Sequence, residues 1–142
     1  MSHGFPLPDT DLELTRPFWQ AAERHELVIP RCVGCGAYNW YPRADCQRCG
    51  NPDMPWTAVS GRGVLFSWAI VETPLAKPFA DLVPYVSALV ALDEAPEVRL
   101  VSRLVDCDPT RLCFDQPLHA IYRSLEFPGV EGRVTAPFFT PV

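Results

Sequence analysis

The sequence predicts a mainly β protein in which an N-terminal helix and a cysteine-rich segment precede a small antiparallel barrel or sandwich. The first observation behind this fold class is the proline content: 16 of the 142 residues are proline, more than twice the usual share of about 5%. Proline is excluded from helix interiors and central strands, so it favours short strands joined by ordered loops. The other two observations are a pair of Cys-x-x-Cys-Gly motifs and, after them, several short runs of strand-forming residues.

The N-terminal segment predicts an arm followed by one helix. Residues 1–14 combine glycine, prolines and acidic residues, which indicate an extended arm. A helix is expected over residues 15–26, with Thr15 as its cap and Pro17 in its first turn. Phe18 lies on an apolar side of this helix, so we expect the helix to pack against the rest of the protein.

The next segment, residues 27–53, predicts a metal-bound ribbon. Its two Cys-x-x-Cys pairs are separated by ten residues, and the glycine after each pair can take the positive φ that closes a tight turn. Two thiolates three positions apart in such a turn can reach one ion at about 2.3 Å, and two turns complete a tetrahedron. The predicted ligands are Cys32, Cys35, Cys46 and Cys49.

Four thiolates leave no coordination position for substrate, so the metal is expected to be structural. Soft thiolates suit zinc, with iron as the alternative. A redox dithiol would require a βαβ context that this sequence lacks, and disulfides conflict with a reducing compartment. Cys107 and Cys113 have no second pair nearby and are expected to be small buried or turn residues.

The remainder of the chain, residues 54–142, predicts the barrel or sandwich and a C-terminal tail. Glycine and proline separate its strand-forming runs, and the segment between the second and third runs has the composition of a hairpin turn. The expected strands cover residues 64–71, 85–92, 98–105 and 117–125, with a last apolar run at 134–139 in the tail.

Charge and motif content argue against several function classes. The net charge is −5 and the basic residues form no run, so nucleic acid is not an expected partner. We expect a cytoplasmic protein without a membrane partner, because there is no signal-peptide pattern and no apolar window near the roughly 18 residues of a membrane span. No GxSxG, HExxH, P-loop or GxGxxG motif occurs, which weakens the case for an enzyme.

An ordered set of motifs along residues 15–140 carries a resemblance to one family. The set comprises Phe18-Trp19, Arg31-Cys32-Val33-Gly34-Cys35-Gly36, Tyr41-Pro42-Arg43, Cys46-Gln47-Arg48-Cys49-Gly50, Ser60-Gly61-Arg62-Gly63, Pro84-Tyr85-Val86 and Pro137-Phe138. With this set the chain resembles the domain-of-unknown-function 35 family, in which a rubredoxin-like zinc ribbon precedes an OB-fold. One departure is the Cys-Phe-Asp-Gln-Pro segment at 113–117, where the family usually has a glycine-containing turn.

The resemblance implies a non-catalytic accessory subunit of a thiolase-fold enzyme. The partner would be a thiolase, a hydroxymethylglutaryl-CoA synthase or a retro-aldolase that shortens steroid side chains. The OB-fold is expected to dock on this partner in a hetero-oligomer and to help shape an acyl-CoA site, while the catalytic groups belong to the partner. Two alternatives stay open: a freestanding acyl-CoA-binding protein and a single-stranded nucleic-acid-binding module, which the acidic balance opposes.

Two sets of residues are candidates for these contacts. Aromatic side chains beside rigid prolines are partner-binding candidates because aromatic anchors dominate interface energies, although they can instead cover the open ends of the barrel. These aromatic residues are Phe79, Phe138 and Phe139. Basic side chains are candidates for contact with CoA phosphates, with solvated surface as the alternative for each. These basic residues are Arg62, Lys77 and Arg99.

Overall fold

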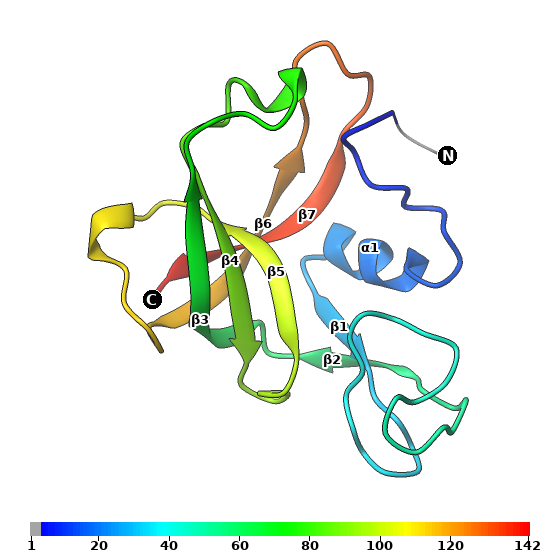
Figure 1. Ribbon diagram of the computed structural model, residues 1–142. Coiled ribbons are helices and arrows are strands. Elements are labelled where there is room, and N and C mark those ends of the chain that lie inside the picture. The colour runs from blue at the N-terminus through cyan, green and yellow to red at the C-terminus, as the bar shows by residue number, and fades with distance from the viewer. Residues whose placement is uncertain (1–3) are drawn as a thin grey trace.

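The computed structural model describes residues 4–142 and has a mainly β fold with one α-helix (Figure 1). The first three residues of the predicted arm lie outside this described part. The fold class expected from the sequence is confirmed. The elements are α1 (Arg16–Glu23), β1 (Leu27–Pro30), β2 (Trp56–Val59), β3 (Arg62–Val71), η1 (Lys77–Phe79), β4 (Tyr85–Leu92), β5 (Arg99–Leu104), η2 (Pro109–Arg111), β6 (Pro117–Leu125) and β7 (Val134–Pro141).

The segment before α1 differs from the predicted extended arm. Residues 4–14 follow a series of turns. The side chain of Leu7 is buried and forms a small apolar cluster with Phe127 and Val134. The segment therefore folds back onto the barrel, because burial of Leu7 removes its apolar surface from water.

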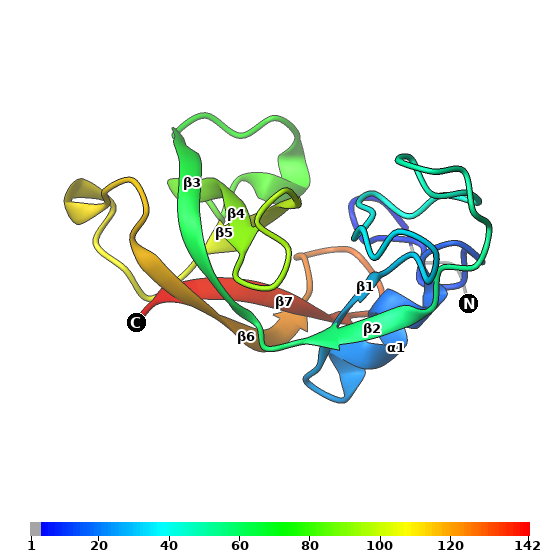
Figure 2. The same ribbon diagram turned by 90° about the horizontal axis from the view of Figure 1, so that it is seen from below.

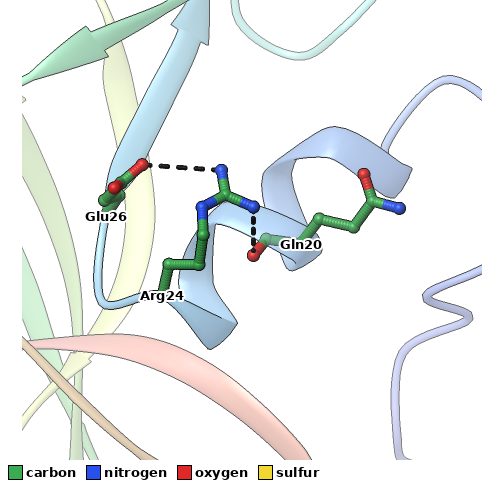
Figure 3. A network of polar contacts seen from close by, with 3 residues as sticks. All are labelled: Gln20, Arg24 and Glu26. Atoms are coloured by element: carbon green, nitrogen blue, oxygen red, sulfur yellow. Dashed lines mark hydrogen bonds and ion pairs between the residues drawn. The ribbon is translucent and has the colours of Figure 1, made fainter.

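The helix α1 covers less of the chain than the predicted residues 15–26. It stops early because His25 has φ 59°, and the N–H groups of His25 and Glu26 bond at 2.9 Å to carbonyls of the last helical turn. This is the Schellman arrangement, in which a residue in the left-handed region ends the helix. Arg24 spans the same corner, donating to the carbonyl of Gln20 at 3.1 Å and lying 3.5 Å from the Glu26 carboxylate (Figure 3).

Five strands form a closed barrel in the order β3-β4-β5-β7-β6. Neighbouring strands are antiparallel except β5 and β7, which pair in parallel where Leu104 lies opposite Phe139. Each of the five predicted runs overlaps one of these strands, and only the run at 98–105 extends one residue beyond its strand at each end. The predicted hairpin is formed by β4 and β5. A closed five-stranded barrel of this kind is the OB-fold architecture.

The loop before β6 includes residues 113–117, a segment that contains no glycine. Asp115 takes φ 61°, a left-handed conformation that aspartate tolerates better than most residues. Its N–H donates to the carbonyl of Leu65 at 2.9 Å, and the N–H of Leu65 donates to the carbonyl of Gln116 at 2.9 Å. Asp115 therefore supplies the left-handed residue of this turn.

A separate two-stranded sheet joins the cysteine-rich segment to the barrel. β1 and β2 pair antiparallel, with Leu27 opposite Val59. Leu27 and Ile29 belong to the same buried apolar core as the barrel side chains. Because this pairing spans the predicted boundary at residues 53 and 54, the division of the chain into domains stays a prediction.

The elements surround the barrel unevenly. Figures 1 and 2 both show α1 and the β1–β2 sheet on one side, where α1 packs against β1 and β7, whereas β3 forms the opposite side. Within the described residues, no helix has the length and apolar character that crossing a membrane requires.

Candidate metal centre

Residues 31–55 connect β1 to β2 and fold into two similar turns. In the first turn, the N–H of Gly36 donates to the carbonyl of Cys32 at 2.9 Å, and in the second, the N–H of Gly50 donates to the carbonyl of Cys46 at 2.8 Å. Both glycines have positive φ, 75° and 79°, which confirms the conformation predicted for them. The two motifs therefore form one repeated turn, and each turn presents a pair of sulfur atoms.

The sulfur atoms of the two turns gather at one point. All four Sγ atoms lie within 4.8 Å of one another, with 3.5 Å between Cys32 and Cys49 and 3.6 Å between Cys35 and Cys46. Four thiolates bound at about 2.3 Å to a tetrahedral ion lie about 3.8 Å apart. The donor set therefore fits a four-thiolate metal centre in number, chemistry and spacing, and among residues 4–142 the cysteines form no disulfide.

Asn39 belongs to this centre, although the cysteine motifs do not reveal it. Its side chain is fully buried. The Oδ1 atom accepts a hydrogen bond from the N–H of Gln47 at 2.8 Å, while Nδ2 lies 3.5 Å from the sulfur of Cys46 and 3.3 Å from the carbonyl of Ala37. The only signal in the sequence is one amide side chain within the aromatic run of residues 38–41.

Hydrogen bonds to the sulfur of Cys46 favour its thiolate. The amide of Asn39 contributes most and, with backbone N–H groups that include that of Arg48 at 3.4 Å, lowers the pKa of Cys46 to about 6 against the opposing effect of burial. The thiolate is the form of cysteine that binds metals. These hydrogen bonds therefore favour the negatively charged, metal-binding form of Cys46.

The basic residues predicted to contact CoA phosphates do not form one cluster. Arg62 is exposed at the start of β3, beside a hollow of about 430 Å³. Arg99 starts β5, stacks 4.1 Å from the ring centre of Phe66 and donates to the carbonyl of Pro96. Lys77 is exposed in η1, at the other end of β3 (Figure 1). Their contact with CoA stays a prediction.

The aromatic residues predicted to bind a partner differ in exposure. Phe139 is completely buried in the barrel core. Phe138 is 6% exposed, and the guanidinium of Arg103 lies 4.8 Å from its ring centre. This burial favours the alternative role for both rings, in covering the barrel. Phe79 is half-buried against the ring of Phe127 at 5.5 Å, and its partner-binding role stays a prediction.

A four-cysteine ribbon in series with a five-stranded barrel defines the class as a zinc-ribbon and OB-fold protein. Comparison with protein families agrees along most of the chain. Residues 19–55 match the model described as the ChsH2 rubredoxin-like zinc ribbon domain, and residues 56–123 match the ChsH2 C-terminal OB-fold domain. The chain therefore belongs to the domain-of-unknown-function 35 (DUF35) family, as its ordered motifs predict.

Relatives of this chain are described either as scaffold proteins or as hydratase subunits. A DUF35 domain-containing scaffold protein of Methanothermobacter thermautotrophicus is 28% identical over 127 residues, covering 89% of this chain and 93% of that protein. The 3-oxo-4,17-pregnadiene-20-carboxyl-CoA hydratase alpha subunit of Mycobacterium tuberculosis is 32% identical over 111 residues, 78% of this chain. Only 33% of that subunit is covered, so this chain corresponds to one part of a longer protein there.

A solved structure supports the same family assignment. The fold superposes on a chain of the Ltp2-ChsH2(DUF35) aldolase with a TM-score of 0.78 and 29% identity, covering 94% of this chain and 98% of that one. A DUF35 protein of unknown function from Sulfolobus solfataricus shares the fold, with a TM-score of 0.58 and 14% identity. The similarity to the aldolase component therefore extends through both the ribbon and the barrel.

Proposed function

We propose that this chain is a non-catalytic accessory subunit that docks on a thiolase-fold enzyme and helps to form its acyl-CoA site. The observation that carries this proposal is the superposition on the DUF35 chain of the Ltp2-ChsH2(DUF35) aldolase, which extends over nearly the whole length of both chains. Scaffold proteins among the relatives support a role in assembly, and the hydratase alpha subunit supports a role beside acyl-CoA chemistry.

The metal centre fits a structural part of this role. Cys32, Cys35, Cys46 and Cys49 would hold one Zn²⁺, which would supply a cross-link between the two turns. Four sulfur ligands fill a tetrahedral shell and leave no position at which substrate can bind. The metal therefore has a structural role in the ribbon, and the catalytic groups are assigned to the thiolase-fold partner.

Arg62 and Arg99 are the proposed contacts for CoA phosphates at one end of the barrel. Arg62 shares its hollow with His119 and Ser60, and its guanidinium is suited to a phosphate. The N–H and hydroxyl of Ser60 already donate to the carboxylate of Glu94. Lys77 would make a separate contact at the other end. A steroid-derived acyl group is supported by the pregnadiene substrate named for the mycobacterial relative.

Co-expression with the thiolase-fold protein encoded nearest to this chain tests the docking. A tag on this chain is expected to retain the partner, and the two proteins are expected to elute together in size-exclusion chromatography at micromolar concentration. Separate elution at that concentration would contradict the proposal.

Calorimetry with an acyl-CoA then tests the shared site. Binding is expected for the complex and not for this chain alone, because the site needs both proteins. The variants Arg62→Gln and Arg99→Gln are expected to weaken binding, whereas Arg133→Gln, an exposed arginine elsewhere, serves as the control. Equal binding to the isolated chain would favour the alternative of a freestanding acyl-CoA-binding protein.

A further inference from the structure

The outer surface of β3, β4 and β5 has a regular arrangement of side chains. Strand pairing aligns Ser67, Leu89 and Val101 in one row, and residues directly opposite each other share one face of a sheet. The next row toward η1 is formed in the same way. It consists of Ala69, Ser87 and Arg103. These two rows are called the β3–β5 outer face below.

This face is open and slightly hollow, and the lining of its hollow is mainly apolar. The residues of the intervening rows point into the barrel, where Val86, Ala88 and Leu104 are between 2% and 4% exposed. On the outer face Val101 is 53% exposed. Small side chains at the centre leave a hollow of about 250 Å³, which Leu89 and Val101 border. Figures 1 and 2 show α1 and the ribbon on the β1–β2 side of the molecule, away from β3.

The charge on the outer face is positive. The segments β3, β4 and β5 contain no aspartate or glutamate, although the chain has 17 acidic residues. Arg103 is half-buried, and burial lowers its pKa. It stacks on Phe138 and, among residues 4–142, has no acidic partner.

Two acidic residues line the neighbouring hollow of about 350 Å³ into which Arg103 extends. Asp106 is already paired with Arg123, and Asp81 is exposed to solvent. Partial burial removes water from the guanidinium of Arg103, and no carboxylate within the described part of the chain replaces the lost hydrogen bonds. A carboxylate from another protein would therefore form a strong charge-assisted pair with it.

We infer that the β3–β5 outer face is where the thiolase-fold partner docks, with a protruding apolar side chain in the hollow and a carboxylate on Arg103. This inference rests on the proposed function and adds the surface and the partner chemistry. A concave apolar centre beside one uncompensated cation fits a convex apolar side chain flanked by an acidic one. A second copy of this chain does not fit face to face, because the outer face carries no carboxylate to pair with Arg103.

Substitutions in the outer face test this assignment in the co-expressed complex. Val101→Asp and Arg103→Gln are each expected to weaken binding of the thiolase-fold partner by about tenfold or more. Leu12→Asp is the matched control, because Leu12 is 55% exposed on the segment before α1 and lies outside the outer face. Its affinity is expected to equal that of the unaltered chain. Thermal melts of each variant identify any loss of affinity that comes from unfolding, and Val101→Thr keeps a β-branched residue if Val101→Asp fails to fold.

The outcomes separate the two proposals. If the unaltered chain binds the partner and both outer-face variants bind it equally well, the docking surface is wrong and the accessory role stands. If the unaltered chain forms no complex, both proposals fail. A homodimer of this chain that Val101→Asp dissociates would assign the face to a second copy and overturn the inference.

Discussion

The ribbon and the barrel are held together by different forces. In the barrel, apolar side chains such as Leu65, Val90 and Phe139 are fully buried and exclude water from a common interior. Residues 31–55 bury few large apolar side chains, and their two turns meet where four sulfur atoms converge. A segment this small cannot build a sufficient core from side chains alone, so a metal takes its place. The barrel is thus stabilised by a hydrophobic core and the ribbon by a bound metal.

Removal of the metal is expected to have the largest effect and to act on the ribbon alone. The variant Cys46→Ser, or a strong chelator, removes a binding free energy of about 10–16 kcal/mol from the folded ribbon. Hydrogen exchange is then expected to become fast in residues 31–55 and to stay slow in β3 to β7. Cys113→Ser is the matched control, because Cys113 is exposed and lies outside the sulfur cluster. An equal loss of hydrogen-exchange protection in residues 31–55 and in β3 to β7 would contradict the view that different forces stabilise the ribbon and the barrel.

A cavity in the barrel is expected to destabilise the barrel and to leave the metal bound to the ribbon. Phe139→Ala should lower the free energy of unfolding by about 3–5 kcal/mol, because it deletes a fully buried ring. Chemical denaturation with the metal bound measures this loss. Phe114→Ala, at a ring that is 70% exposed, is the control and is expected to cost far less. A loss of metal from Phe139→Ala before the barrel unfolds would show that the two regions are not separable.

The side chain of Asn39 is expected to determine how tightly the metal is held. Asn39→Ala leaves the N–H of Gln47 without its partner and removes a donor from the sulfur of Cys46. We expect metal affinity to fall by roughly 10–100-fold, the usual cost of losing an outer-shell partner. Competition with a chromophoric chelator measures this change. Gln47→Ala is a matched control, because the contact with Asn39 uses the backbone N–H of Gln47 and the side chain of Gln47 is exposed. An equal loss of metal affinity in both variants would contradict the role of the Asn39 side chain.

The smallest predicted effect concerns the turn that closes the barrel. Asp115→Ala places a less tolerant residue at φ 61° and should cost about 1 kcal/mol more than Asp115→Gly, which accepts that conformation without a Cβ clash. Thermal unfolding of the two variants measures the difference. A more stable Asp115→Ala than Asp115→Gly would show that the conformation at this turn differs from the one described.

What the sequence predicts well depends on local chemistry. The metal turns follow from cysteine spacing and a following glycine, and both glycines have the expected positive φ. The five strands follow from apolar runs separated by glycine and proline, and each run overlaps one strand. The left-handed conformations of His25 and Asp115 escape such reasoning, because neither residue requires a positive φ and only the surrounding packing selects it.

Non-local contacts account for the other differences. The role of Asn39 depends on Gln47, which comes close only after the second turn has formed. Phe139 is buried in the barrel core, whereas Phe138 lies under the guanidinium of Arg103 from β5, and two adjacent aromatic residues give no pattern that reveals either contact. Leu7 likewise meets Phe127 only in the folded chain.

Zinc K-edge X-ray absorption on the purified protein, together with its elemental content, tests the metal-held ribbon most directly. The account predicts one zinc ion per chain, surrounded by four sulfur atoms at about 2.3 Å. A preparation without stoichiometric metal, in which Cys32, Cys35, Cys46 and Cys49 react freely with an alkylating agent in the native state, would contradict it.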